Sequence, residues 1–381
     1  MMDNKDLTVA HIDISPFADA VNNRTEWLDR HAQTQKVFGW FCTYTPIELI
    51  HAAGFLPVRI YGGTIRVEQA GSLIPNFVCP YMRTSLERAL RGEYKYLSGV
   101  IQGYTCDTPC GMMSIWEENT GPGLFHTIPL PYNSGPGAGI FYRHSLDELI
   151  DKLATVGGKV TPASLERSLD LYAEIRKSLL HLYELRLRHK FVLPAGDYYT
   201  VLEAGFSLPP EEYLALLTNL MGVVGNLEAA APGGIPVLIS GSLVEQLWIF
   251  DLIEAAGGRV VGDDLCNGYR CCEPADGMGA DPMERLIDRY THRFPCPARS
   301  TIQDRVPRVK ELVEKSGARG VIFLFQKFCT PHLADYPALA GELKNNGLPV
   351  LLMETDESGN IEGQLKTRFG AFFEMIAGQN G

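Results

Sequence analysis

The chain has 381 residues, of which 45% are hydrophobic and 21% are charged, and its formal net charge is −11. Its length suits about two domains, and its apolar content excludes a largely disordered protein. The acidic charge disfavours proteins that bind nucleic acids or anionic membranes, because both kinds of partner require clustered cations.

The ends and the cysteine content bear on the compartment. No apolar run approaches the roughly 20 residues of a transmembrane helix, and the first residues, Met1 to Asp6, are polar, unlike a signal peptide. We therefore predict a cytoplasmic protein. Stable disulfides are rare in that compartment, so the nine cysteines are expected to be buried thiols, a catalytic thiol or metal ligands.

The first third of the chain alternates short helices and strands. Helices are predicted over residues 44–54 and 84–90, and strands over residues 55–61 and 96–105. Pro46 suits the first turn of the first helix, Gly54 ends it, and the second strand runs into Cys106. This alternation is typical of a parallel sheet.

The middle of the chain is helical. Apolar residues recur at helical spacing from Pro162 to about His189, with Thr161 as the predicted N-cap. A further helix is predicted over residues 211–224, before the Pro/Gly-rich stretch at 231–234. These helices are expected to connect two α/β halves.

The last third repeats a strand–helix pattern. Strands are predicted over residues 235–240, 259–262, 320–325 and 349–353, and helices over 245–256, 284–294, 306–316 and 364–377. The predicted fold is α/β, with two doubly wound parallel-sheet domains joined by a helical segment. The predicted ranges are an N-terminal domain over 1–160, a helical connector over 161–231 and a C-terminal domain over 232–381.

Cysteines recur at the ends of predicted strands. Cys106, Cys266 and Cys329 each follow a strand, and Glu354 follows another. A single cysteine is most often a small buried hydrophobe. Ligands of open α/β sheets bind at the carboxyl ends of the strands, so this repeated placement favours a functional role.

The cysteine spacing excludes compact metal motifs. The sequence contains no Cys-x2-Cys, so a zinc ribbon and a thioredoxin-like motif are unsupported. Ligands of an iron–sulfur cluster would be far apart in sequence, and Cys79, Cys106 and Cys329 are one candidate set. Cys42 is then either a fourth ligand or a pocket residue. His332 is either an acid/base group beside the cluster or a residue of a helix's first turn.

Short stretches in order along nearly the whole chain resemble the 2-hydroxyacyl-CoA dehydratase / benzoyl-CoA reductase family. The stretches are residues 39–54, Cys79-Pro80 with Arg83 and Ser85, Cys106-Asp107, 263–270, 295–297, 326–337, 354–356 and 363–368. The resemblance implies two α/β domains with a [4Fe–4S] cluster between them, held by Cys79, Cys106 and Cys329. It also implies a homologous second subunit, so that a heterodimer forms, and a separate ATP-dependent activator with its own [4Fe–4S] cluster. The chain has no P-loop of its own, which agrees with ATP hydrolysis and electron supply by a separate activator.

The activity that this resemblance implies is elimination of water from an (R)-2-hydroxyacyl-CoA by a one-electron, ketyl-radical mechanism. The added electron expels the hydroxyl group and makes the β-proton far more acidic. His332 and Glu354 are the predicted candidates for moving that proton. The benzoyl-CoA reductase branch, which reduces an aromatic ring in an ATP-dependent reaction, is the alternative, and an electron-relay subunit without chemistry of its own is another.

The sequence also departs from the family pattern. Thr330 stands where many relatives carry Asp after the Phe-Cys pair, and Cys110, Cys271 and Cys272 match no family ligand. We interpret the adjacent Cys271 and Cys272 as structural. Some relatives hold a double-cubane [8Fe–9S] cluster and reduce small molecules without a CoA substrate. The further cysteines that leave this alternative open are Cys42, Cys266 and Cys296.

Overall fold

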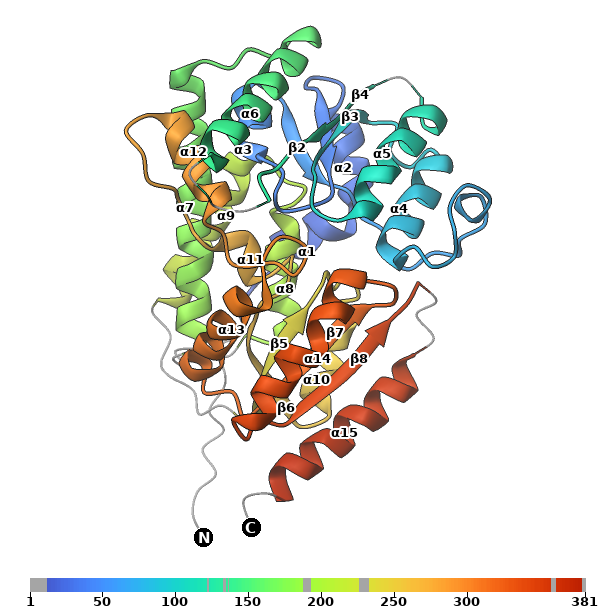
Figure 1. Cartoon of the computed structure of the whole chain (residues 1–381), viewed down its shortest axis with the longest axis vertical. Helices are drawn as coiled ribbons and strands as arrows, with labels where there is room; N and C mark the ends of the chain where they lie inside the picture. Colours follow the sequence, from blue (N-terminus) through green and yellow to red (C-terminus); the bar gives the residue numbers. More distant parts are fainter. Residues whose placement is uncertain are drawn as a thin grey trace.

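The computed structural model describes residues 12–121, 123–132, 135, 137–187, 193–225, 233–357 and 361–378. Within these ranges the chain forms two parallel four-stranded sheets, one above the other in Figure 1, each surrounded by helices. The predicted α/β fold with two parallel sheets is confirmed. No helix of the described ranges has both the length and the apolar character needed to cross a bilayer.

The first sheet has the strand order β2-β1-β3-β4, and every pairing is parallel. Its strands are β1 (Val37–Trp40), β2 (Leu56–Arg59), β3 (Leu97–Gly103) and β4 (Leu124–Ile128). The surrounding elements are α3 (Ile47–Ala52), η1 (Ala70–Ser72), α4 (Pro80–Leu90), α5 (Asp107–Asn119) and α6 (Ala138–Thr155). All residues of β1 and β2 are buried, as expected for a sheet that is covered on both faces.

The second sheet has the equivalent order β6-β5-β7-β8, also all parallel. Its strands are β5 (Ile235–Gly241), β6 (Gly258–Asp263), β7 (Gly320–Gln326) and β8 (Val350–Thr355). Its helices are α10 (Trp248–Ala255), α11 (Tyr269–Cys272), α12 (Pro282–Thr291), α13 (Ile302–Ser316), α14 (Thr330–Asn345) and α15 (Glu362–Gly378). In each sheet the strand order reverses beside the first strand, between β1 and β3 and between β5 and β7. Ligands of such sheets bind at this switch point.

Five helices complete the described chain. They are α1 (Ser15–Asn22), α2 (Arg24–His31), α7 (Pro162–Leu187), α8 (Ala195–Ala204) and α9 (Pro210–Val224). The long helix α7 packs on α3 of the first half and on β6 of the second, along the side of the molecule in Figure 1. The Ser164 amide donates to Thr161 Oγ1 at 3.0 Å, as an N-cap requires.

The predicted domain limits stay predictions. The limit at 231/232 lies outside the described residues. The second half also returns to the first, because α12 packs on α6 and α7. The predicted division into residues 1–160, 161–231 and 232–381 therefore assigns α6, α7 and α12 to three different ranges, although α12 packs on both of the others.

Strands β1 and β4 and helices α5, α6 and α8 are among the elements absent from the sequence predictions. Strands β1 and β4 contain four and five residues, too few for a clear alternation of apolar and polar positions. The helix expected over 245–256 begins instead at Trp248. Glu245 lies before this helix, and its carboxylate accepts hydrogen bonds from the amides of Gly62 and Gly63, at 2.8 and 2.9 Å.

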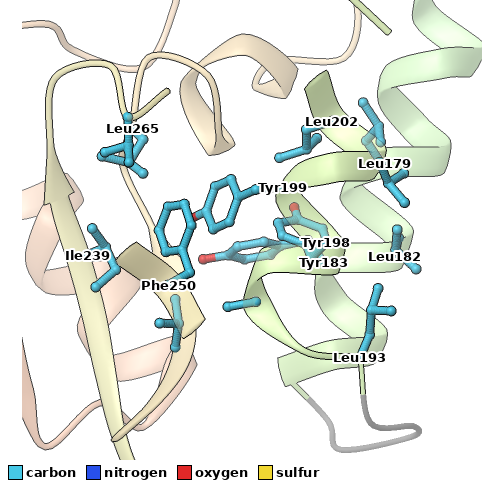
Figure 2. Close-up of a cluster of buried hydrophobic side chains, with 14 of the residues drawn as sticks. Leu179, Leu182, Tyr183, Leu193, Tyr198, Tyr199, Leu202, Ile239, Phe250 and Leu265 are labelled. Atoms are coloured by element: carbon cyan, nitrogen blue, oxygen red, sulfur yellow. The ribbon is translucent and has the colours of Figure 1, made fainter. Parts of the chain in front are cut away.

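A large apolar cluster joins the connecting helices to the second sheet (Figure 2). At its centre the ring of Tyr199 on α8 stacks on Phe250 of α10, with centroids 3.8 Å apart and an interplanar angle of 7°. Neither side chain is exposed. Leu179 and Leu182 of α7 and Ile239 of β5 belong to the same cluster.

We expect Phe250→Ala to lower the free energy of unfolding by roughly 3–5 kcal/mol, because it leaves a cavity and removes the stacked pair. Urea unfolding measures this change. Phe141, which is 48% exposed on α6, is the matched control, and Phe141→Ala should cost less than about 0.5 kcal/mol. Equal effects of the two substitutions would contradict this view of the core.

The Glu245 contact links the two halves and is sensitive to pH. Burial raises the pKa of the Glu245 carboxyl from 4.5 to about 7. Between these values the folded chain binds the proton more tightly than the unfolded chain does. Protonated Glu245 therefore stabilises the fold, and this contribution is lost as the pH rises through about 7.

We expect the free energy of unfolding of Glu245→Gln to fall less than that of the original chain between about pH 5 and about pH 8. Glutamine keeps a side-chain oxygen as acceptor but has no proton to lose. Denaturant unfolding at several pH values tests this. Parallel pH profiles of the two proteins would show that Glu245 does not titrate in this range.

Candidate metal centre

A cavity of about 120 Å³ lies at the carboxyl ends of both sheets. Residues within three positions of the ends of β1, β3, β5, β6 and β7 line it, together with the last residue of β2 and the start of α4. The switch points of the two sheets therefore face the same space, the usual place of a ligand in this kind of fold.

Six of the nine cysteines line this cavity. They are Cys42, Cys79, Cys106, Cys266, Cys296 and Cys329. Three come from the first half of the chain and three from the second, and all are free thiols. Cys110, Cys271 and Cys272 are not among its lining residues. The adjacent thiols of Cys271 and Cys272 lie 3.6 Å apart on α11.

The three predicted ligands share one structural position. Cys79, Cys106 and Cys329 are the N-cap residues of α4, α5 and α14. The positive end of a helix dipole favours a thiolate over a thiol at its N-terminus. Each of these helices thus presents a thiol to the cavity from its positively polarised end.

Without a bound metal these thiols are protonated at neutral pH. Burial raises the pKa of Cys79 to about 11. Burial, and then the neighbouring thiols, raise the pKa values of Cys106 and Cys329 as well. Binding of iron by these residues would therefore release protons and be favoured at higher pH.

His332 lies beside Cys329 in the cavity wall. The side chain is 5% exposed, with Nδ1 3.3 Å from Cys329 Sγ and Nε2 3.2 Å from Arg270 Nη2. A guanidinium group only donates, so we assign Nε2 as the acceptor and place the ring proton on Nδ1, towards the sulfur. Burial, and then the charges of Arg270 and Arg305, hold the pKa of His332 well below its ordinary value, so the ring is neutral.

Glu354 lies apart from these residues. It is an exposed residue of β8 and does not line the cavity. Strand β8 is at the edge of its sheet, beyond β7, whereas the switch point lies between β5 and β7. A position at a strand end therefore brings Cys329 to the cavity but leaves Glu354 outside it.

Two features fix the turn that carries Cys329. Phe328 adopts φ = +63°, in the left-handed region that residues with a Cβ rarely occupy. Gln326, at the end of β7, accepts a hydrogen bond from the Tyr81 amide at 2.8 Å and donates to Leu243 O at 3.2 Å. Tyr81 lies in the first turn of α4, so Gln326 ties the helix of Cys79 to the strand of Cys329.

We expect Gln326→Leu to lower the free energy of unfolding by roughly 2–3 kcal/mol. The substitution leaves the Tyr81 amide and the Leu243 carbonyl buried without partners. Lys327→Ala, next to it, removes only an exposed ion pair with Asp356 and should cost less than about 1 kcal/mol. Denaturant unfolding compares the two variants, and similar small losses would contradict the linking role of Gln326.

The donor set fits a cluster better than a single ion. Within the described ranges, no three His, Cys, Asp or Glu side chains are arranged as ligands to one metal ion. In a four-iron cluster each thiolate binds a different iron, so the sulfur atoms need not converge on one point. Thiols at three helix ends around an apolar cavity meet this requirement.

Comparison with known proteins identifies the family. A family model described as 2-hydroxyglutaryl-CoA dehydratase, D-component, matches residues 42–376. The chain belongs to this family. The curated relatives are named as dehydratase or reductase subunits, so this is a family of enzymes.

Three relatives cover nearly the whole chain. The chain is 27% identical to the (R)-phenyllactyl-CoA dehydratase beta subunit of Clostridium sporogenes, over 94% of this chain and 97% of that protein. It is 28% identical to one of the subunits of benzoyl-CoA reductase of Thauera aromatica, over 90% and 91%. It is 28% identical to lactoyl-CoA dehydratase subunit beta of Anaerotignum propionicum, over 95% and 98%.

Sequence reasoning missed two residues of the cavity wall. Gln326 and Arg59 line it, and neither is among the predicted site residues. A signal existed for Arg59, because it interrupts the otherwise apolar β2 with a charge. Gln326 at the end of a continuous apolar strand gives a similar signal.

Proposed function

We propose that this chain is the iron–sulfur subunit of a 2-hydroxyacyl-CoA dehydratase-type enzyme. Such an enzyme eliminates water from an (R)-2-hydroxyacyl-CoA by a one-electron, ketyl-radical mechanism. The observation that carries the proposal is that Cys79, Cys106 and Cys329 are N-caps of three helices around one cavity. When bound there, a [4Fe–4S] cluster supplies one-electron chemistry and an open iron that acts as a Lewis acid.

The residues of the chain would have separate tasks. The three N-cap thiolates would bind the cluster, and the apolar side chains of Phe41, Met82 and Leu243 in the cavity wall would exclude water. His332 holds a proton on Nδ1 beside Cys329. Because His332 lines the cavity and the exposed Glu354 does not, His332 is our first candidate for moving the β-proton.

The names of the relatives support a partner subunit. Each of the three is named as a subunit, two of them as beta subunits, which supports a multi-subunit enzyme. We propose a homologous second subunit, a separate ATP-dependent activator with a [4Fe–4S] cluster as electron donor, and an acyl-CoA substrate. We propose the cytoplasm as the location of this complex.

The relatives differ in the type of reaction that their names state. Two of the three are dehydratase subunits, and the third belongs to benzoyl-CoA reductase. With the partner and the activator present, loss of water from a 2-hydroxyacyl-CoA would support the dehydratase. Reduction of benzoyl-CoA alone would instead support the reductase.

A second candidate rests on the number of cysteines. Cys42, Cys266 and Cys296 line the same cavity as the three proposed ligands. A double-cubane [8Fe–9S] cluster, bound by all six thiolates in a reductase of small molecules, would use every one of them. A single four-iron cluster leaves three without a ligand role.

We expect Cys106→Ala and Cys329→Ala to lose most of the bound iron and the activity, because each removes a thiolate ligand. Cys272→Ala, a buried thiol outside the cavity, should keep both. Iron and acid-labile sulfide are measured on protein purified without oxygen. Full iron retention in the first two variants would refute the proposed ligands.

The same analysis separates the two clusters. About four iron atoms per chain, unchanged in Cys266→Ala, would support the [4Fe–4S] cluster. About eight, with a large loss in Cys266→Ala, would support the double cubane.

A further inference from the structure

Arg59 is a buried cation in the wall of the cysteine cavity. It is the last residue of β2, and it is 6% exposed. Within the described residues its Nε and Nη1 atoms have no hydrogen-bond partner. Leaving the donors of a buried guanidinium group unpaired is costly, so a partner for them is expected.

The nearby carboxylates are engaged with other groups. Glu203 pairs with Arg24 at 3.5 Å and accepts a hydrogen bond from Asn267 at 2.8 Å. Glu245 accepts from the two glycine amides described above. These carboxylates act on Arg59 through charge, but they do not satisfy its free N–H groups.

Three aromatic rings surround the Arg59 guanidinium. Its central carbon lies 5.0 Å from the ring centroid of Phe206, 5.5 Å from that of Trp40 and 6.0 Å from that of Tyr81. Such contacts use the faces of the planar group and leave its N–H edge available. The rings thus fix the cation in place without neutralising it.

A second buried arginine, Arg270 from the other half of the chain, lies behind the cavity wall, against two of its lining residues. Arg270 is 3% exposed, and its Nη2 lies 3.3 Å from Cys266 Sγ and 3.2 Å from His332 Nε2. Its Nε and Nη1 also have no partner among the described residues. One guanidinium group with unpaired N–H groups therefore lines the cavity, and a second contacts Cys266 and His332 in its wall.

An iron–sulfur group would supply the missing negative charge. A [4Fe–4S] core with three thiolate ligands is an anion, and its charge becomes more negative by one when it accepts an electron. Its sulfur atoms accept hydrogen bonds, and such bonds together with nearby charge set the reduction potential. A fixed cation stabilises the reduced form more than the oxidised form.

We propose that Arg59, assisted by Arg270, is the built-in counter-cation of the iron–sulfur group and raises its reduction potential. Arg59 donates its free N–H groups to sulfur atoms of the bound group. The redox step adds one electron from the activator, and no bond to Arg59 forms or breaks. Arg59 is thus a positioning and tuning residue, and this role rests on the proposed function.

The test is a redox titration of the anaerobically reconstituted full chain, followed by electron paramagnetic resonance, with dithionite as reductant. For Arg59→Met we expect a more negative midpoint potential. At the original midpoint the ratio of reduced to oxidised cluster should fall about tenfold, which is about 59 mV for one electron. Arg59→Lys keeps the charge and should shift the potential less.

The matched control is Arg88→Met, which removes the same charge away from the cavity. Arg88 also packs over an aromatic ring, that of Tyr61 at 5.2 Å, and it pairs with Glu93. Its substitution should leave the potential unchanged. An Arg59→Met protein with the original iron content and potential would overturn the proposal, even if turnover of the acyl-CoA were lost.

Stability provides a second readout that a merely structural arginine would not give. In the metal-free chain, Arg59→Met removes a buried group whose Nε and Nη1 atoms have no hydrogen-bond partner, so the urea midpoint should stay equal or rise. In the iron-loaded chain the same substitution should lower it. Equal destabilisation of both forms would overturn the proposal, whereas an original chain that binds no iron would refute the proposed function itself.

Discussion

The site depends on one geometric constraint, the meeting of two switch points of parallel sheets. Strands β1 and β3 in one half, and β5 and β7 in the other, end at the same cavity. Helices α4, α5 and α14 begin there, each with a cysteine at its N-cap. Because the orientation of a helix is set by its packing on the sheet, the fold itself directs three thiols towards one space.

Contacts between the two halves hold their relative positions. Gln326 binds the first turn of α4, and Glu245 binds the amides of Gly62 and Gly63. The long helix α7 packs on both halves. The cavity is therefore formed by surfaces that cannot shift independently without breaking buried hydrogen bonds.

Charge gives the cavity its chemical character. Burial raises the pKa values of Cys79, Cys106 and Cys329 and lowers that of His332. Arg59 and Arg270 bring positive charge to the same place with free N–H groups. An iron–sulfur core would bind the thiolates, and the resulting anion would accept hydrogen bonds from the arginines, which is the physical link between the family of this chain and the proposed cluster.

Much of this architecture could be predicted from the sequence. Long apolar runs such as residues 320–325 indicate buried parallel strands, and Cys106 and Cys329 stand out because they follow such strands. Cys79 precedes a helix rather than following a strand, so no strand-end signal marks it, and the sequence offers it only as one member of a candidate ligand set until the family resemblance is considered. Glu354 carries the same strand-end signal, but β8 is an edge strand, and strand order is not encoded in local pattern. The roles of the remaining site residues depend on contacts between distant parts of the chain. Examples are the contacts of Arg59 with Phe206 and of Gln326 with Tyr81. The spacing of apolar residues along the chain does not predict such contacts.

The most direct test of the account is anomalous X-ray scattering at the iron edge from crystals grown without oxygen. The account predicts strong iron density within the cavity, next to the sulfur atoms of Cys79, Cys106 and Cys329. Iron density elsewhere, or none after anaerobic reconstitution, would contradict it and leave these thiols as packing residues.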